Sequence, residues 1–104
     1  MNSPVNKEKK AELIQLLTST LPVLRAAIGI SQEEIASYIG VSRQTYSALE
    51  QGKRPMSWNT FLSLFLFFIS NTETNEMLKI KKGFIAQVYH FLQYNPTDSP
   101  VQYP

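Results

Sequence analysis

Apolar residues recur at intervals of three and four along most of the chain, and no stretch alternates with the period of two expected for a half-buried strand. This spacing predicts an all-α protein with helices over about residues 6–18, 21–28, 32–39, 43–51 and 58–70. Asn6 is the expected cap of the first helix. After a polar connection at 71–75, a last helical pattern runs to about residue 93. We expect a kink or break at Gly83, because glycine weakens a helix by about 1 kcal/mol relative to alanine.

Capping residues mark the boundaries of the two central helices. Ser31 and Glu34 have the spacing of a capping box, in which each side chain accepts a hydrogen bond from the other residue's amide. Gly40 ends the helix that Ser31 begins, and Ser42 is the cap of the next. Gly52 can adopt the left-handed conformation that ends this second helix. Two short helices therefore meet at a tight turn.

The residues around this turn have the layout of a helix-turn-helix. Ala36 is small where two steeply crossing helices approach, and Gly40 tolerates the bend between them. The side chains expected to fill the wedge are Ile35, Ile39, Val41, Tyr46 and Leu49. The residues left on the free face of the second helix are small, polar or cationic, whereas a simple solvated face usually carries more Glu and Lys: Arg43, Gln44, Thr45, Ser47 and Ala48.

Over about residues 21–70 the chain resembles the Cro/phage-repressor (XRE-type) helix-turn-helix regulators. The motifs that carry the resemblance are Leu24-Arg25, Ile30-Ser31-Gln32-Glu33-Glu34-Ile35-Ala36, Gly40-Val41-Ser42-Arg43-Gln44-Thr45, Leu49-Glu50-Gln51-Gly52-Lys53 and the apolar helix after Ser57. The resemblance implies a compact helical bundle that binds double-stranded DNA, usually as a homodimer. Here a repressor-like five-helix core would carry N- and C-terminal helical extensions. Tyr46 departs from the branched aliphatic residue usual in the family, and its ring fits only if the hydroxyl reaches water or a partner.

Roles carried over by position make the helix at 43–51 the recognition helix in the major groove. An arginine can pair with guanine, a glutamine with adenine, and small side chains can meet a thymine methyl or a base edge. The resemblance thus implies base contacts by Arg43, Gln44, Ser47 and Ala48. It implies phosphate contacts by Gln32, Ser42, Thr45, Lys53 and Arg54, aided by the backbone amides at the helix starts.

Length and composition limit the other functions. With 104 residues the chain holds one domain, which we place at 1–94 with its core at about 21–70, followed by a flexible tail at 95–104. There is no cysteine and one histidine, so we expect no metal site and no cofactor. The single aspartate lies in the tail and the glutamates fall in helix starts or solvent faces. We therefore expect no catalytic residues and no enzyme activity.

Nothing in the sequence favours a membrane or a small-molecule effector as a partner. The most apolar run, 61–69, has nine residues, about half of the roughly 20 that span a bilayer, and no signal peptide precedes the first helix. We therefore expect a cytoplasmic protein, with no room for a separate effector domain. The apolar stripe at 84–92 is expected to cover the Phe-rich helix 58–70, either within the chain or across a two-fold axis.

These observations favour a sequence-specific DNA-binding transcriptional regulator, and a repressor because no activation surface is evident. A second interpretation is a protein-interaction module of the same fold, such as an antitoxin-like protein that binds another polypeptide. A third is a non-specific nucleic-acid binder, for which the net charge of +2 is small.

Overall fold

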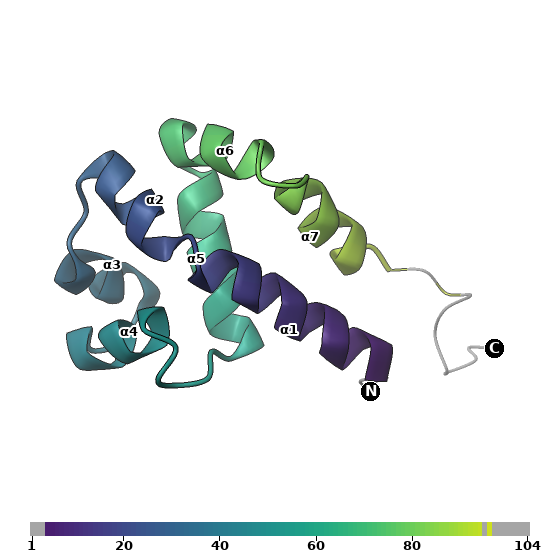
Figure 1. Cartoon of the computed structure of the whole chain (residues 1–104), viewed down its shortest axis with the longest axis horizontal. Helices are drawn as coiled ribbons and strands as arrows, with labels where there is room; N and C mark the ends of the chain where they lie inside the picture. The colour runs from purple at the N-terminus through teal and green to yellow at the C-terminus, as the bar shows by residue number, and fades with distance from the viewer. Residues whose placement is uncertain (1–3, 95, 97–104) are drawn as a thin grey trace.

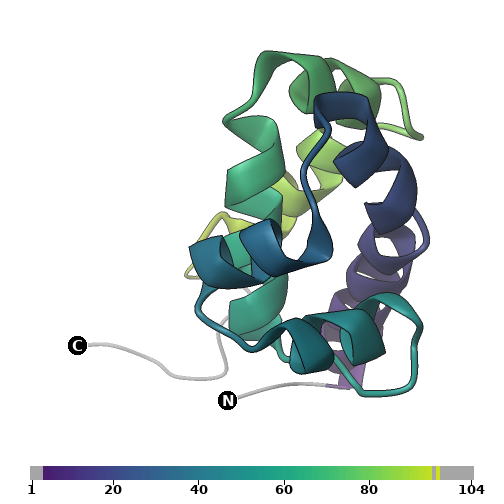
Figure 2. The same cartoon turned by 90° about the vertical axis from the view of Figure 1, so that its left-hand side faces the viewer.

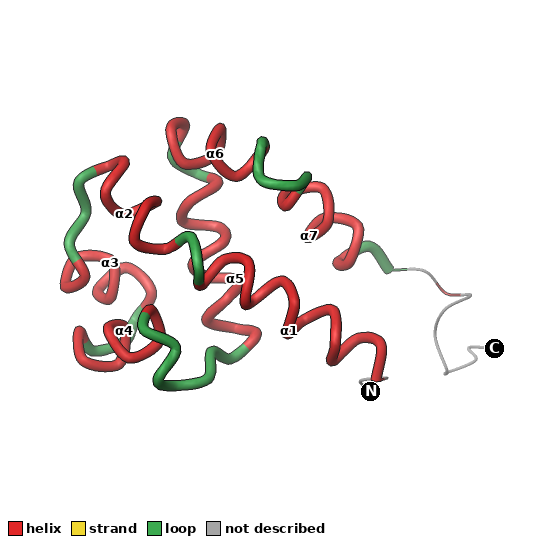
Figure 3. The backbone as a smooth tube through the Cα atoms, in the orientation of Figure 1, coloured by secondary structure: helices red, strands yellow, loops and turns green. Residues whose placement is uncertain are grey.

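The computed structural model describes residues 4–94 and 96, with side chains from residue 6 onward, and folds them into seven α-helices joined by short loops (Figure 3). Their bounds are α1 (Pro4–Thr18), α2 (Leu21–Ile28), α3 (Gln32–Ile39), α4 (Arg43–Glu50), α5 (Trp58–Ile69), α6 (Thr72–Lys79) and α7 (Phe84–Leu92). The described residues contain no strand, so the prediction of an all-α bundle is confirmed. The expected tail at 95–104 lies, except for residue 96, outside the described residues.

The other helices are arranged around α5, which runs through the middle of the molecule behind α1 in Figure 1. Helix α1 packs against α5, α2 packs against α6, and α3 packs against both α4 and α5. Helices α3 and α4 form one end of the bundle and α7 lies toward the other (Figures 1 and 2). Along the chain, residues 21–70 hold four helices, α2 to α5, and α6 is the fifth helix between the N-terminal α1 and the C-terminal α7.

The core is built around the apolar helix α5. Its residues Phe61, Phe65 and Phe68 are buried, and Phe84 at the start of α7 is buried against them. The ring of Phe84 lies 6.2 Å from that of Phe61 and 5.7 Å from that of Phe65. Val88, one turn further along α7, has no exposed surface. Helix α7 therefore covers part of α5 within the chain, through Phe84 and Val88, whereas Tyr89 and Leu92 of the same stripe are about half exposed.

Two helix starts differ from the predictions. Helix α1 begins at Pro4, so Asn6 lies inside the helix and is not its cap; proline is favoured at the first helical position, where its missing N–H is not needed. The segment predicted as a polar connection contains the first turn of α6, which begins at Thr72. Its polar side chains satisfy the last carbonyls of α5: Thr74 Oγ1 donates to Phe68 O at 2.5 Å and Asn75 Nδ2 donates to Ile69 O at 2.7 Å.

The expected break at Gly83 is confirmed. Gly83 has φ +65°, in the left-handed region that favours glycine, and α7 begins at the next residue. The preceding Lys82 also has positive φ, at +51°. The single C-terminal helical pattern is therefore two helices, α6 and α7, set at an angle to each other (Figure 1).

No single helix among the described residues is long and apolar enough to cross a membrane. Helices α1 and α2 reach that length and composition only as a pair, and the pair is bent by 44° at its break. Leu13, Leu17, Leu21 and Leu24, which supply much of this apolar character, are buried in the core.

Candidate nucleic-acid interface

Helices α3 and α4 form the predicted helix-turn-helix. The turn begins at Gly40, whose φ of +80° lies in the left-handed region, and the Val41 amide donates to Ala36 O at 3.0 Å. Ala36 is 1% exposed and lies where the two helices meet, as its small size predicts. Ile35 and Leu49 are buried in the wedge between them, and Ile39 and Val41 are partly buried.

Both helices begin at the predicted caps. The Glu34 amide donates to Ser31 Oγ at 3.0 Å, and the Ser31 amide donates to Glu34 Oε1 at 3.0 Å, so the capping box is complete. At the start of α4 the Thr45 amide donates to Ser42 Oγ at 3.0 Å. Side-chain caps thus satisfy two amides at the start of α3 and one at the start of α4, and the other first-turn amides remain available to an anion.

A buried ion pair joins α4 to α2. Arg25 Nε donates to Glu50 Oε2 and Arg25 Nη2 donates to Glu50 Oε1, both at 2.8 Å, so the pair is bidentate. The Glu50 side chain is only 6% exposed and that of Arg25 is 19% exposed. A third nitrogen, Arg25 Nη1, donates to Ile30 O at 3.2 Å in the loop before α3.

Tyr46 and Gln32 complete this network around the Glu50 carboxylate. The Tyr46 hydroxyl donates to Glu50 Oε2 at 2.6 Å, and Gln32 Nε2 donates to Glu50 Oε1 at 3.4 Å. Tyr46 has no exposed surface, so its hydroxyl has found the partner that a buried ring requires at this position. One carboxylate thus ties α4 to α2 and α3, and we call Arg25, Gln32, Tyr46 and Glu50 the Glu50 network.

The network shifts the pKa values of its members. Burial raises the pKa of the Tyr46 hydroxyl far above its ordinary value, and the hydrogen bond to Glu50 raises it further. Burial also works to raise the pKa of Glu50, but the hydrogen bonds from Arg25 and Tyr46 outweigh it and hold that pKa below its ordinary value. The hydrogen bond to Glu50 raises the pKa of Arg25. Glu50 is therefore held ionised and Tyr46 neutral.

Sequence reasoning missed this network. The expectation that every glutamate lies at a helix start or on a solvent face is wrong for Glu50, which is the last residue of α4 and mostly buried. The spacing of four between Tyr46 and Glu50 is the one local signal that was readable. Arg25 lies 25 residues from Glu50 along the chain, and no helical periodicity connects them.

The outward face of α4 carries the predicted base-contacting residues. Arg43 and Gln44 are exposed, and Ser47 and Ala48 are partly exposed. Neither the Arg43 nor the Gln44 side chain makes a hydrogen bond or ion pair with another described residue. The Ser47 hydroxyl accepts a hydrogen bond at 3.1 Å from Nε2 of Gln51, an exposed residue directly after α4.

The residues predicted to contact phosphate differ in whether their side chains already make hydrogen bonds within the protein. Lys53 and Arg54 are exposed, and their amides donate to Ala48 O, which places both shortly after the end of α4. The Ser42 hydroxyl caps α4 and donates to Thr45 Oγ1 at 3.0 Å, so both hydroxyls serve the helix start. Gln32 is turned inward to Glu50, which leaves its second amide N–H for an outer partner.

No group of three acidic or histidine side chains that could hold a metal ion occurs among the described residues, and the chain has no cysteine.

Comparison with known families matches the model described as helix-turn-helix to residues 24–57, which extend from within α2 to the cap of α5. No curated protein and no solved structure matches the chain. The matched segment contains both helices of the motif, their turn and the whole Glu50 network. Residues 24–57 are thus similar to the helix-turn-helix of Cro/phage-repressor (XRE-type) proteins, and this similarity supports a DNA-binding role for the segment.

Proposed function

We propose that this protein is a sequence-specific transcriptional repressor that acts in the cytoplasm and binds its operator as a homodimer, with α4 in the major groove. One observation carries the proposal. Helix α4 is anchored from behind by the Glu50 network, while Arg43 and Gln44 on its outer face are exposed and make no polar contact with other described residues. A rigidly held helix with unengaged polar groups is suited to reading base edges.

The side chains on the outer face of α4 match the chemistry of major-groove recognition. The Arg43 guanidinium has the fork geometry that pairs with guanine, and the Gln44 amide has the donor and acceptor that pair with adenine. Each such bidentate contact discriminates against a wrong base by about 1–3 kcal/mol. Ser47 and Ala48 are small enough to approach a base edge or a thymine methyl.

Residues that flank this face would position the protein on the DNA backbone. Lys53 and Arg54 supply two cations after α4, and Gln32, Ser42 and Thr45 lie at the starts of α3 and α4 with the first-turn amides. Affinity from cationic contacts falls as salt rises. Because the net charge is only +2, base contacts must supply much of the preference for an operator.

The proposed dimer follows from the length of the recognition helix. Helix α4 has eight residues and covers few base pairs, so a second copy in the next major groove, roughly 34 Å away, is needed for a selective site. We assign this activity to residues 1–94 as one domain with its core at about 21–70. We propose repression because a dimer bound to an operator covers it.

The test is selection of bound duplexes from a random DNA pool at near-physiological salt. We expect a palindrome with half-sites about one helical turn apart. In Arg43→Ala and Gln44→Ala the preference should relax at one position of each half-site, whereas Lys79→Ala, which removes an exposed cation from α6, should leave the palindrome unchanged.

A folded wild-type protein that enriches no sequence would contradict the proposal. Binding that ignores Arg43→Ala but weakens equally with any lost lysine would indicate non-specific attraction instead. Co-purification of another polypeptide, without any DNA preference, would favour the partner-binding interpretation.

A further inference from the structure

A group of large apolar side chains is exposed where α3 packs on α5. Tyr38 of α3 is 73% exposed and Leu66 of α5 is 59% exposed. The Tyr38 ring lies 5.0 Å from the ring of Phe67 in α5, and Phe67 is partly buried. We call Tyr38, Ser63, Leu66, Phe67 and Ser70 the α3–α5 surface.

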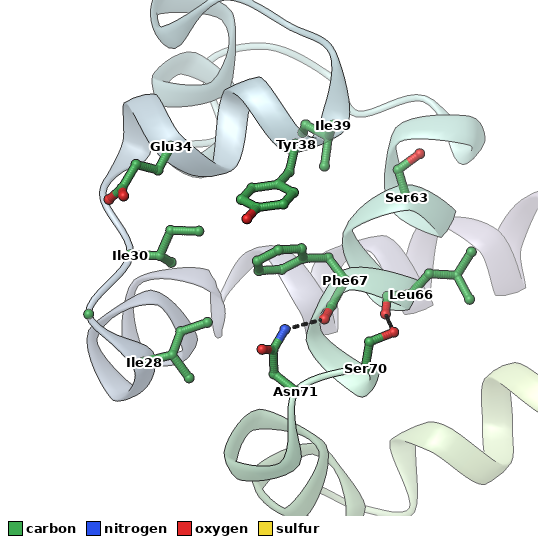
Figure 4. A pocket seen from close by; sticks show the side chains of 11 residues that line it. Ile28, Ile30, Glu34, Tyr38, Ile39, Ser63, Leu66, Phe67, Ser70 and Asn71 are labelled. Carbon is green, nitrogen blue, oxygen red and sulfur yellow. Dashed lines mark hydrogen bonds between the residues drawn. The ribbon is translucent and has the colours of Figure 1, made fainter.

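A groove of about 620 Å³ opens on this surface (Figure 4). The paired rings of Tyr38 and Phe67 form its middle, and Ile28 and Ile30 lie along one side. In Figure 4 the Leu66 side chain projects away from the groove at the opposite side. The surface therefore offers an apolar side chain, Leu66, that projects outward directly beside a hollow lined by apolar and uncharged polar side chains together with Glu34.

The α3–α5 surface is uncharged. Helix α5 contains no charged residue, and Glu34 is the one charged residue that lines the groove. The Glu34 carboxylate accepts the Ser31 amide of the capping box and lies on the far side of the groove from Leu66 (Figure 4). In a two-fold interface, residues near the axis meet their own copies, so a charge there would be repelled. An uncharged surface with a projection beside a hollow is complementary to itself.

We propose that the α3–α5 surface binds a second copy of this chain about a two-fold axis near Leu66, with Leu66 of one protomer packed into the groove of its partner. This inference rests on the proposed function as a dimeric DNA-binding regulator. Helix α3 is joined to α4 by the three residues 40–42, so an axis at this surface runs beside the end of the bundle that carries α4 (Figure 2). Both recognition helices can then face the same side of one duplex.

The exposed apolar residue Ile80 is less suited to such contact. It is 86% exposed between α6 and α7, but Lys79, Lys81 and Lys82 surround it in the sequence. A two-fold axis there would bring six lysines from two copies together. Ile80 is therefore a matched control: an equally apolar, exposed residue outside the proposed interface.

The test measures mass in solution by light scattering and sedimentation equilibrium at micromolar concentration. We expect the wild-type protein to have about twice the mass of the 11.9 kDa chain. Leu66→Lys and Tyr38→Lys should each raise the dimer dissociation constant at least tenfold, whereas Ile80→Lys should leave it within about twofold of wild type. Thermal unfolding by circular dichroism confirms that each variant is folded.

A monomeric wild-type protein would overturn the proposal. So would a folded Leu66→Lys protein that dimerises like wild type, or an Ile80→Lys protein that dissociates as strongly as Leu66→Lys.

DNA binding separates failure of this interface from failure of the proposed function. With both correct, Leu66→Lys binds the selected palindrome at least tenfold more weakly than wild type but keeps the same preference on a single half-site. If Leu66→Lys abolishes dimers of a protein that shows no DNA preference, the interface stands and the proposed function fails. If the wild-type protein selects a palindrome and Leu66→Lys binds it equally well as a dimer, the function stands and this interface fails.

Discussion

Two regions of this small bundle, the helix-turn-helix and the core around α5, are held together by different kinds of contact. At the helix-turn-helix end, the Glu50 carboxylate accepts hydrogen bonds from Arg25, Tyr46 and Gln32, with distances from 2.6 to 3.4 Å. Around α5 the contacts are between rings, such as Phe65 with Phe61 at 6.1 Å and with Phe84 at 5.7 Å. We call Phe61, Phe65, Phe68 and Phe84 the aromatic cluster.

The two kinds of contact suit different roles in the two regions. Ring packing supplies much stability because it removes large apolar areas from water, but it is weakly directional. A bidentate ion pair has a narrow range of distances and angles, so it fixes how α4 lies on α2 and α3. The aromatic cluster thus keeps the chain folded, and the Glu50 network sets the orientation of α4, which carries Arg43 and Gln44.

The largest expected effect comes from opening the aromatic cluster. Phe65→Ala removes a ring that is 2% exposed and should lower the free energy of unfolding by about 4 kcal/mol, through lost burial and a cavity. Urea unfolding followed by circular dichroism measures this loss. Val23→Ala, at an α2 residue that is 58% exposed, is the control and should change stability by less than about 0.5 kcal/mol. A Phe65→Ala protein as stable as this control would show that the cluster does not carry the fold.

Breaking the ion pair should be the next largest effect. Glu50→Gln leaves the Arg25 guanidinium mostly buried without its counter-charge and should cost about 3 kcal/mol of stability. Unlike Phe65→Ala, it should also weaken operator binding when both variants are compared at temperatures where they are fully folded. Equal DNA affinity of the two folded variants would contradict the division of roles between the Glu50 network and the aromatic cluster.

Removing one hydroxyl from the network should be milder. Tyr46→Phe keeps the buried ring but loses the 2.6 Å hydrogen bond to Glu50 Oε2, at a cost of about 2 kcal/mol. Arg25 still neutralises the carboxylate, so the loss should be smaller than in Glu50→Gln. The same urea titration, run on both variants, checks the order. A loss in Tyr46→Phe as large as in Glu50→Gln would show that the hydroxyl, and not the ion pair, dominates.

The smallest expected effect is on the acid dependence of stability. The pKa of Glu50 is lower in the folded protein than its ordinary value of 4.5, so its contribution is complete above that value and is lost as the pH falls through the folded pKa. Wild-type stability should therefore fall more steeply below about pH 4.5 than that of Glu50→Gln. Glu34, whose pKa the Ser31 amide lowers, adds a loss of the same sign in both proteins. Identical slopes for the two proteins would contradict the role of Glu50.

Local signals predicted most of the helix-turn-helix correctly. Ser31, Ser42 and Gly40 act on backbone groups within a few residues, so the boundaries of α3 and α4 could be read from them. The same reasoning misplaced the start of α6, because Thr74 and Asn75 look like loop residues in the sequence. Their hydrogen bonds to the end of α5 form only when α6 packs against α5.

The candidate site divides in the same way. The sequence by itself determined the caps, the turn and the residues on the outer face of α4, since helical periodicity places Arg43 and Gln44 on the side opposite Leu49. Only the tertiary structure decided that Glu50 meets Arg25 from α2, that α7 covers α5 within the chain, and that Tyr38 and Leu66 stay exposed side by side. These contacts join residues up to several helices apart, and their geometry depends on how whole helices cross, which no pattern within a single helix records.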